Sequence, residues 1–479
     1  MAGPATSALD ALIRARAVAV IGASNTPNAA GGDKLGTVAL KHLIKHGYQG
    51  AIYPVNPKET TVEGLPCFPT LDAVPGDIDM AVIAVPGPAC AAVMAACGER
   101  GVKAAIVLAS GFAEAGQRDM ETELINAART GGVRFCGPNT NGLISVAGAM
   151  APCTSMVCQL DVFRPGGIAF ITQSGAVGGS MLGTGTEEMG GFSHWISVGN
   201  EANLTVADYL DWLADDPDTT VITLFIEGIR DPDRFAKASA RAAAAGKPIV
   251  LNKIGLSDVS AAASLSHTGA MVGSDDVFNA VCKKFGLVRV DDASELLPTA
   301  ITFSRLLNKL PRGRNMGLVA PSGGIGGVCA DECHRWGLDV PELSAETQKA
   351  LKSSLPAFAA LRNPVDVTQE IRSFKTGYQD TIRTVLQAPE IDGLFLLVTM
   401  VAEPRASIYA DMFTDAAKSA DKPVIVAWTG AASLASKALP ALKQNGVPVY
   451  MSARGAVKAM RRLYDYGRFL DSVGTEPQR

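Results

Sequence analysis

One histidine of this chain lies in a segment made almost entirely of small residues. His267 follows Ala261–Ser266 and precedes Thr268-Gly-Ala270. A ring on such a loop can be reached by a substrate, and neutral imidazole is nucleophilic near physiological pH. We therefore take His267 as a candidate catalytic residue.

The four other histidines have more ordinary surroundings. His42 and His46 are four residues apart on what reads as a polar helix face. His194 is expected in a loop, and His334 follows a cysteine on a helix. We expect solvated or structural roles for all four.

A carboxylate closes one apolar strand. In Thr223-Leu-Phe-Ile-Glu227-Gly228 the acid stands at the end of the run, which is the ligand edge of a parallel sheet, and a buried Glu there needs a partner. A nearby imidazole would be oriented and stabilised in its charged form by such a group. Glu227 could equally cap the turn before Arg230-Asp231, and the sequence leaves both interpretations open.

A short glycine turn follows the first apolar strand. Val18-Ala-Val-Ile-Gly22-Ala-Ser-Asn25 is a strand followed directly by a phosphate-type turn. The dinucleotide fingerprint requires G-x-G-x-x-G and an acid near the end of the second strand. Here Ser24 takes the third position, and Asn56-Pro-Lys58 offers a cation instead of a carboxylate. This favours coenzyme A, or NADP, over NAD.

Two further segments repeat one another. Residues 168–179 and 316–327 share a strand, a Ser-Gly-x-x-Gly-Gly turn and a helix start. Small residues there let backbone N–H groups and a helix N-terminus face an anion. Close packing of strand on helix would select the same residues, so the second segment fits either role.

With these residues in view, the sequence resembles the α subunit of the ADP-forming (NDP-forming) acyl-CoA synthetases, relatives of succinyl-CoA synthetase. The resemblance covers nearly the whole chain. It rests on six short segments in order: Gly137-Pro-Asn-Thr140, Gln173-Ser-Gly-Ala176, Val198-Gly-Asn200, Asp215-Asp-Pro217, Ser266-His-Thr-Gly-Ala270 and Asn363-Pro-Val-Asp366. It implies a Rossmann-like CoA-binding domain followed by two flavodoxin-like domains.

The resemblance also implies roles for single residues. His267 matches the phosphorylated histidine of the family, and Glu227 the carboxylate that hydrogen-bonds it. The loop and helix start that hold phosphate are matched by Ser174, Gly175 and Ala176. The residues that match the CoA site are Gly22, Ala23, Ser24 and Asn25 at the phosphates, Lys58 as the basic residue, Leu108, Ala109 and Ser110 as a further contact, and Asn139 near the thiol end.

The implied reaction has three steps. Phosphohistidine passes its phosphoryl group to a carboxylic acid, CoA thiolate attacks the acyl phosphate, and His267 exchanges phosphoryl with ADP or ATP.

We find no ATP-grasp module in the chain, so the resemblance implies a separate ATP-grasp β subunit that binds ATP/ADP and Mg²⁺, in an α₂β₂ or similar assembly. Succinyl-CoA synthetases carry a Tyr-Glu pair where this chain has Gly179 and Ser180, so succinate is not expected, and smaller side chains would leave room for a bulkier acyl group.

These residues must be positioned by a repeated pattern of short apolar runs, Gly/Ser/Pro turns and Ala-rich amphipathic segments. Such runs predict parallel strands covered on both faces. The predicted strands are Ala17–Ile21, Gly50–Val55, Met80–Val85, Ala104–Leu108, Val133–Cys136, Gly167–Ile171, Ile196–Val198, Thr220–Ile226, Pro248–Leu251, Met316–Ala320, Gly393–Val398, Pro423–Ala427 and Val447–Met451. We expect an α/β fold of three doubly wound domains, at residues 1–150, 151–305 and 306–479.

Composition narrows the class of protein. The 479 residues carry 43 Lys plus Arg against 47 Asp plus Glu, a formal charge of −4, so no general basic field for nucleic acid or an anionic membrane exists. The longest uncharged run, Met80–Gly98, is broken by Pro86-Gly-Pro88 and makes a poor membrane span. We identify no signal peptide.

The nine cysteines form no C-x-x-C pair. The four at helical spacing, Cys90 with Cys97 and Cys329 with Cys333, are expected as buried free thiols. The protein is therefore interpreted as soluble, reduced and cytoplasmic.

Two alternatives to the ligase subunit stay open from sequence. An NADP-dependent oxidoreductase would need a residue poised for hydride chemistry in the second domain. A catalytically silent CoA- or acyl-CoA-binding regulatory protein would not need both His267 and Glu227.

Overall fold

The protein is described here from a computed structural model, which covers residues 7–257, 259–260, 275–356, 359–368 and 375–477. Contacts group the chain into two units, Met1–Ala300 and Ile301–Arg479. Among the described residues, unit 1 contains two large sheets and a two-stranded one, and unit 2 contains one large sheet. The expected division into three domains stays a prediction.

The first sheet of unit 1 is parallel, in the order β2-β1-β5-β6-β7. Its strands are β1 (Ala17–Ile21), β2 (Ala51–Val55), β5 (Met80–Ile83), β6 (Ala104–Val107) and β7 (Arg134–Cys136), with a small hairpin of β3 (Thr61–Val62) and β4 (Leu65–Pro66). The accompanying helices are α1 (Ala8–Ile13), α2 (Leu35–Lys45), α3 (Gly87–Glu99), α4 (Arg118–Gly131) and η1 (Ala113–Ala115). The winding direction reverses between β1 and β5, which makes that point the expected ligand edge.

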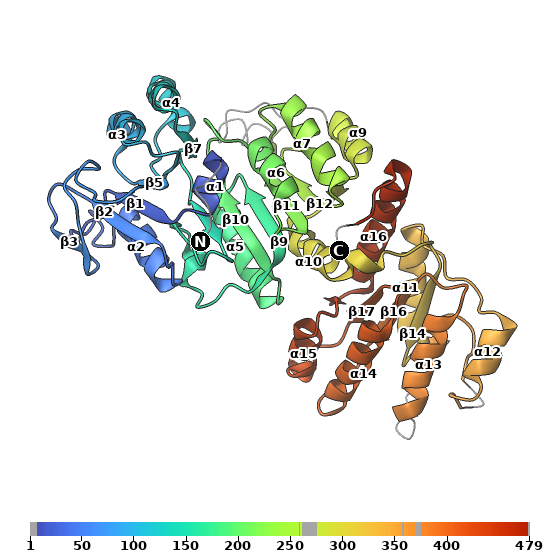
Figure 1. Ribbon diagram of the computed structural model, residues 1–479. Coiled ribbons are helices and arrows are strands. Elements are labelled where there is room, and N and C mark those ends of the chain that lie inside the picture. The colour runs from blue at the N-terminus through green and yellow to red at the C-terminus, as the bar shows by residue number, and fades with distance from the viewer. Residues whose placement is uncertain (1–6, 258, 261–274, 357–358, 369–374, 478–479) are drawn as a thin grey trace. The chain divides into compact units, whose positions relative to one another are not determined.

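The second sheet follows the same winding. Its order is β13-β12-β11-β9-β10-β8, and only β8 is antiparallel to its neighbour. Figure 1 labels the four central strands β12, β11, β9 and β10. The strands are β8 (Leu143–Ser145), β9 (Pro165–Thr172), β10 (Phe192–Ser197), β11 (Val221–Ile226), β12 (Ile249–Lys253) and β13 (Val288–Arg289). The helices are η2 (Met156–Gln159), α5 (Gly175–Glu187), α6 (Val206–Asp215), α7 (Pro232–Ala244), α9 (Asp275–Phe285) and η3 (Ala293–Glu295), while α10 (Leu296–Leu306) runs across the boundary of the units.

Unit 2 holds a third sheet of the same type, parallel and ordered β15-β14-β16-β17-β18. Its strands are β14 (Met316–Ala320), β15 (Val365–Asp366), β16 (Gly393–Val398), β17 (Val424–Trp428) and β18 (Val449–Tyr450). Its helices are η4 (Leu307–Lys309), α11 (Gly323–Arg335), α12 (Ala345–Leu351), α13 (Lys375–Gln387), α14 (Arg405–Ser419), η6 (Ala432–Ala435), α15 (Ala438–Gln444) and α16 (Ala453–Val473). The expected α/β class with mainly parallel sheets is confirmed.

The apolar strands are continuous because each face of a strand joins a core. In β1, Val18 and Val20 belong to one buried cluster, while Ala19 and Ile21 belong to another on the opposite face. The cluster that contains Val18 extends through the second sheet to Ile249 and Leu251 of β12. In a parallel sheet that is covered on both faces, apolar residues do not alternate with polar ones along a strand. The strands therefore appear in the sequence as continuous apolar runs, which is why they could be located.

Two expectations about single residues are settled by burial. The four cysteines at helical spacing are buried and free, as predicted. His42 is not on a polar helix face, because it is 4% exposed and its Nδ1 lies 2.6 Å from the carbonyl oxygen of Cys153. Its neighbour His46 makes a similar contact, at 3.0 Å, with the carbonyl of Cys158. The helix face that carries both rings therefore packs against segment 153–159.

Among the described helices, none combines the length and the apolar character that crossing a membrane requires.

A buried glycine lets α2 approach the turn that follows β1. A Cβ on Gly36 would lie 2.8 Å from the backbone nitrogen of Ala23 and 3.0 Å from the carbonyl carbon of Gly22. Backbone atoms cannot rotate away, so we expect Gly36→Ala to lower the free energy of unfolding of unit 1 by about 1–3 kcal/mol. The matched control is Gly183→Ala in α5, where a Cβ would meet only Val157 at 3.8 Å and helix propensity should raise stability by up to about 1 kcal/mol. Urea unfolding of the two variants measures this, and equal stabilities would contradict the packing account.

Candidate active site

A cavity of about 880 Å³ lies at the carboxyl edge of the first sheet. Gly22, which follows β1, and Val85, which follows β5, line it at the point where the strand order reverses. Lys34 and Lys58 line it as well and are the cations of its wall, while Leu35, Ala92 and Val93 supply an apolar surface. The cavity can thus accept a ligand that is part anionic and part apolar.

The turn at 22–25 is tightly built. Gly22 has φ +95°, and a Cβ there would lie 2.5 Å from the carbonyl oxygen of Ala84, so only glycine fits. The backbone N–H of Ser24 donates to Thr37 Oγ1 at 3.0 Å, and that hydroxyl donates back to the carbonyl of Ser24 at 2.8 Å. Ala23 and Ser24 are buried, so of the four residues predicted at the CoA phosphates only Gly22 lines the cavity.

A carboxylate holds this turn, which corrects the expectation that the end of the second strand offers none. Glu59 accepts hydrogen bonds from Ser24 Oγ at 2.7 Å, from the Asn25 backbone N–H at 3.0 Å and from Asn25 Nδ2 at 3.1 Å. The Ser24 bond is the largest of the influences that lower the pKa of Glu59. Glu59 directly follows Lys58, the last residue of the segment in which no carboxylate was found.

Of the other residues predicted for the CoA site, Lys58, Ala109 and Ser110 line this cavity. Lys58 is exposed, and its backbone N–H donates to Asn56 Oδ1 at 3.0 Å. Ala109 and Ser110 line the cavity, whereas Leu108 is buried behind them. The Asn139 N–H donates to the Ala109 carbonyl at 2.8 Å, which places Asn139 directly beside this wall.

A second group of predicted residues gathers at the carboxyl edge of the second sheet. Ser174 follows β9, and Glu227 follows the neighbouring strand β11. Ser174 is the N-cap of α5, with its Oγ accepting from the Val177 N–H at 3.4 Å. The start of a helix carries partial positive charge and favours an anion.

The side chain of Asn141 lies close to Gly175 at this helix start. A Cβ there would lie 2.5 Å from Asn141 Nδ2. Ala176 and Ser180 line a second cavity of about 450 Å³ along α5. The neighbouring Gly179 opens no room into it, because a Cβ at 179 would lie 2.5 Å from Ser155 Oγ.

Gln173 joins the two strand ends, and sequence reasoning assigned it no role. Glu227 is 6% exposed, and its backbone N–H donates to Gln173 Oε1 at 2.5 Å. The Gly228 N–H donates to the same oxygen at 3.1 Å. Glu227 is therefore held beside the Ser174 loop by the residue that precedes that loop. The sequence does point to this residue, because Gln173 is the first residue of one of the segments that carry the family resemblance.

Glu201 is the second residue that sequence reasoning missed. It is 5% exposed and accepts a hydrogen bond from Gln173 Nε2 at 2.5 Å. Burial raises the pKa of this carboxyl to about 7. It directly follows Val198-Gly-Asn200, another segment of the resemblance, but nothing in its spacing marks it as buried.

His267 and its loop lie outside the described residues. The structure thus brings Ser174, Gly175, Ala176 and Glu227 together at one sheet edge, and leaves the position of His267 a prediction.

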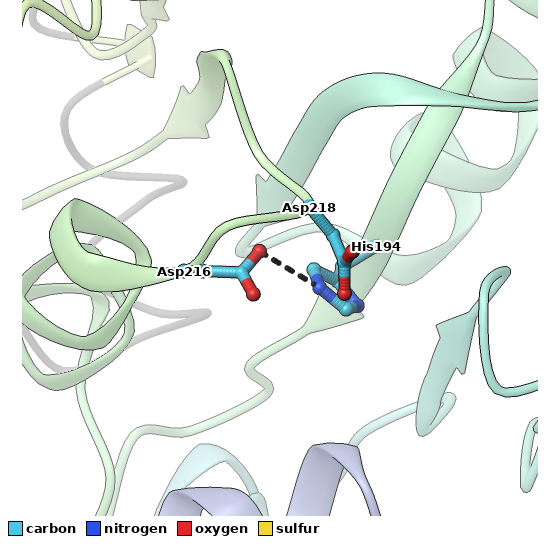
Figure 2. Close-up of side chains that lie close together, drawn as sticks. All are labelled: His194, Asp216 and Asp218. Atoms are coloured by element: carbon cyan, nitrogen blue, oxygen red, sulfur yellow. Dashed lines mark hydrogen bonds and ion pairs between the residues drawn. The ribbon is translucent and has the colours of Figure 1, made fainter.

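A third cluster is a network of structural ion pairs. His194 is 1% exposed on β10, which corrects its expected place in a loop. Figure 2 shows its ring facing Asp216, with Nε2 3.1 Å from Oδ2, and Asp218 beside them. The three have the ligand types of a metal site, but the Arg14 guanidinium pairs with both acids. Although burial opposes it, the bonds from His194 and Thr219 lower the pKa of Asp216.

Comparison with known proteins gives three domain matches in chain order. A CoA binding domain matches residues 16–145, a succinyl-CoA ligase like flavodoxin domain residues 165–303, and a Ligase-CoA domain residues 316–471.

Similar proteins cover almost the whole chain. The α subunit of ADP-forming acetate–CoA ligase I of Pyrococcus furiosus is 35% identical, over 96% of this chain and 98% of that subunit. A trans-feruloyl-CoA synthase from an unknown prokaryotic organism is 32% identical over 96% of this chain but only 65% of its own length. The dinucleotide-forming acetyl-coenzyme A synthetase 1 of Ca. Korarchaeum cryptofilum, solved with phosphate and ADP, superposes with a TM-score of 0.89 at 31% identity, over 97% of this chain and 98% of that one.

The P. furiosus α subunits and the three domain matches show the family: the chain belongs to the α subunits of the ADP-forming acyl-CoA synthetases, the acid–thiol ligases related to succinyl-CoA synthetase.

Proposed function

We propose that this chain carries out the acyl and thiol steps of an ADP-forming acid–CoA ligase, with His267 as the phosphoryl carrier and Glu227 as its carboxylate partner. The observation that carries the proposal is the pairing of the Ser174–Ala176 helix start with Glu227 across two neighbouring strands. An anion-binding helix start beside a buried carboxylate suits a site where phosphoryl is transferred to and from an imidazole.

In the direction of acyl-CoA synthesis, the proposed reaction has three steps. A carboxylate oxygen of the acid attacks phosphorus on phosphohistidine; the N–P bond breaks and an acyl phosphate forms. The CoA thiolate then attacks the carbonyl carbon; the C–O bond breaks and inorganic phosphate leaves with its electron pair. Finally a ring nitrogen of His267 attacks the terminal phosphorus of ATP, and ADP leaves.

Each group of residues has one task in this scheme. The α5 start at Ser174, Gly175 and Ala176 neutralises charge on the transferred phosphoryl group and on the phosphate that leaves. Glu227 orients the imidazole and stabilises its charged form, as a carboxylate does when it accepts a hydrogen bond from a ring nitrogen.

The cavity of the first sheet fits coenzyme A. Its volume of about 880 Å³ suits a nucleotide-sized ligand, and Lys34 and Lys58 offer cations to phosphates. The apolar wall of Leu35, Ala92 and Val93 can take adenine or pantetheine carbons. In this proposal Gly22, Ala23, Ser24 and Asn25 form the turn at the CoA phosphates, Leu108, Ala109 and Ser110 form a further wall, and Asn139 lies near the thiol end.

Nucleotide and Mg²⁺ belong, in this proposal, to a separate ATP-grasp β subunit. The support is that the P. furiosus relative is named as a subunit and is matched over 98% of its length, whereas this chain spans only 65% of the feruloyl-CoA synthase. An α₂β₂ or similar assembly in the cytoplasm completes the proposal, and the nine free cysteines suit a reducing compartment. The proposed domains are 1–150 for CoA, 151–305 for phosphohistidine, and 306–479.

The acid proposed is a monocarboxylic acid such as acetate. Relatives at similar identity are named for acetate and for ferulate, so acyl size separates members of this family. Ser180 faces the cavity along α5, and that cavity is the proposed space for an acyl group larger than acetyl.

CoA binding tests the first half of the proposal. Coenzyme A at about one hundred times its Kd should stabilise the fold by about 2.7 kcal/mol, whereas NADP⁺ and NAD⁺ should give no thermal shift.

Lys58→Ala should weaken CoA binding by roughly ten- to a hundredfold, because a hydrogen bond to a charged group contributes about 1.5–3 kcal/mol. Lys237→Ala, an exposed change on α7, is the control and should leave the Kd unchanged. A shift with NADP⁺ and none with CoA would favour the oxidoreductase instead.

Replacing the proposed nucleophile tests the second half. We expect His267→Asn to abolish acid-, CoA- and ATP-dependent ADP formation in the complex with the partner subunit, because an amide cannot replace the nucleophilic imidazole that carries phosphoryl in this proposal. Its affinity for CoA should stay within twofold of wild type. The control His334→Asn changes an exposed ring on α11 and should keep full turnover. Full turnover by His267→Asn would contradict the phosphohistidine mechanism, and intact CoA binding with no wild-type turnover would favour the silent regulatory protein.

A further inference from the structure

Three neighbouring strands of the second sheet end in side chains that bond to one another. Gln173 follows the central strand β9, Glu201 comes after β10 on one side, and Glu227 follows β11 on the other. We propose that Gln173 and Glu201 are positioning residues, with Glu201 fixing the orientation of the Gln173 amide and Gln173 fixing the backbone of Glu227. The proposal rests on the function proposed above for Glu227.

The amide of Gln173 uses all of its hydrogen-bonding capacity. Its Oε1 accepts from the backbone N–H groups of Glu227 and Gly228, at 2.5 and 3.1 Å. Its Nε2 donates to Glu201 Oε2 at 2.5 Å and to the Gly228 carbonyl at 2.8 Å. Two acceptor sites and two N–H donors are all that an amide has. Any rotation of the side chain would therefore break bonds on both sides in a place where water cannot replace them.

Glu201 determines the orientation of the Gln173 amide. Its Oε1 accepts from the Val206 N–H at 2.6 Å, at the start of α6, which leaves Oε2 to face Gln173. An ionised carboxylate only accepts, so it selects the NH₂ end of the amide. The carbonyl end is then turned toward Glu227 and Gly228. An amide at position 201 would remove this selection.

A direct chemical role for Glu201 does not fit its surroundings. The residue is 5% exposed, and both carboxylate oxygens are engaged within the protein. It also adopts φ +53°, a conformation that few residues with a Cβ tolerate. Its effect on the reaction must pass through Gln173.

The charge state of Glu201 gives the network a pH dependence. Burial raises its pKa to about 7. Arg230, after β11, favours the charged form, and Asp208, on α6, opposes it. Cys136 and Tyr209 also face it, and burial raises the pKa of both, that of Cys136 to about 11, so both are neutral at pH 7. Protonation of Glu201 below about pH 7 weakens its preference for the NH₂ end of Gln173.

Phosphorylation of the full-length chain by labelled acetyl phosphate gives a direct readout, because this step runs the acid half-reaction backward and needs no nucleotide. Glu201→Gln should slow labelling of His267 by roughly ten- to a hundredfold while the Kd for CoA stays within twofold. The wild-type rate should fall as pH drops through about 7, and this inflection should vanish in Glu201→Gln.

Three companion variants separate positioning from general damage. The exchange Gln173→Glu with Glu201→Gln restores a carboxylate-to-amide bond and should label faster than Glu201→Gln alone. Asp211→Asn removes a carboxylate of α6 that pairs with Arg241 rather than Gln173; it should label at the wild-type rate. Gln173→Met removes all four hydrogen bonds of the amide, so His267 should be labelled slowly in this variant. It replaces Glu201→Gln as the test if Glu201→Gln does not fold.

The outcomes are distinct. If the wild-type chain takes up label neither from acetyl phosphate nor from labelled phosphate with acetyl-CoA or feruloyl-CoA, the proposed function fails, whatever the variants do. If the wild-type chain is labelled, and Glu201→Gln or Gln173→Met is labelled equally fast with the same pH profile, the positioning proposal is overturned and the proposed function stands.

Discussion

The buried amide of Gln173 is the interaction on which the candidate site depends. It ties the ends of β9, β10 and β11 together, and the Ser174 loop begins at the next residue. A buried polar group without partners is costly, so all members of this network must be satisfied at once. The position of Glu227 therefore follows from the sheet and not from a flexible loop.

The turn that carries Glu201 also reaches toward the first sheet. Asn200 accepts from Asn139 Nδ2 at 3.2 Å and donates to Glu114 at 2.5 Å and to Glu121 at 3.0 Å. Asn139 in turn bonds to Ala109 on the wall of the large cavity. Two consecutive residues, Asn200 and Glu201, thus connect the proposed CoA site with the proposed phosphohistidine site.

The third sheet repeats the Ser-Gly turn at Ser322. A Cβ on Gly323 would lie 3.3 Å from Asp366 Oδ2, so a carboxylate lies beside the repeated turn.

Much of this fold was predictable because its strands are buried on both faces. β1, β14 and β16 begin and end at the predicted residues, since continuous apolar runs between turns leave no other interpretation. The strands that were missed, β3, β4, β8, β13 and β15, have two or three residues each, too few for a pattern. His42 and His194 were misplaced because their partners, Cys153 and Asp216, are distant or unremarkable in sequence. Gln173 and Glu201 were not singled out from sequence because their hydrogen bonds depend on which strands are neighbours.

The central claim is that this one chain joins a CoA site to a phosphoryl-carrying histidine. The most direct test mixes the purified chain, without partner or nucleotide, with an acyl-CoA and labelled inorganic phosphate, using acetyl-CoA and feruloyl-CoA in parallel. The account predicts release of free CoA and an acid-labile, base-stable label on His267 with at least one of the two. CoA release and label that appear only after a second subunit is added, or label on another residue, would contradict it.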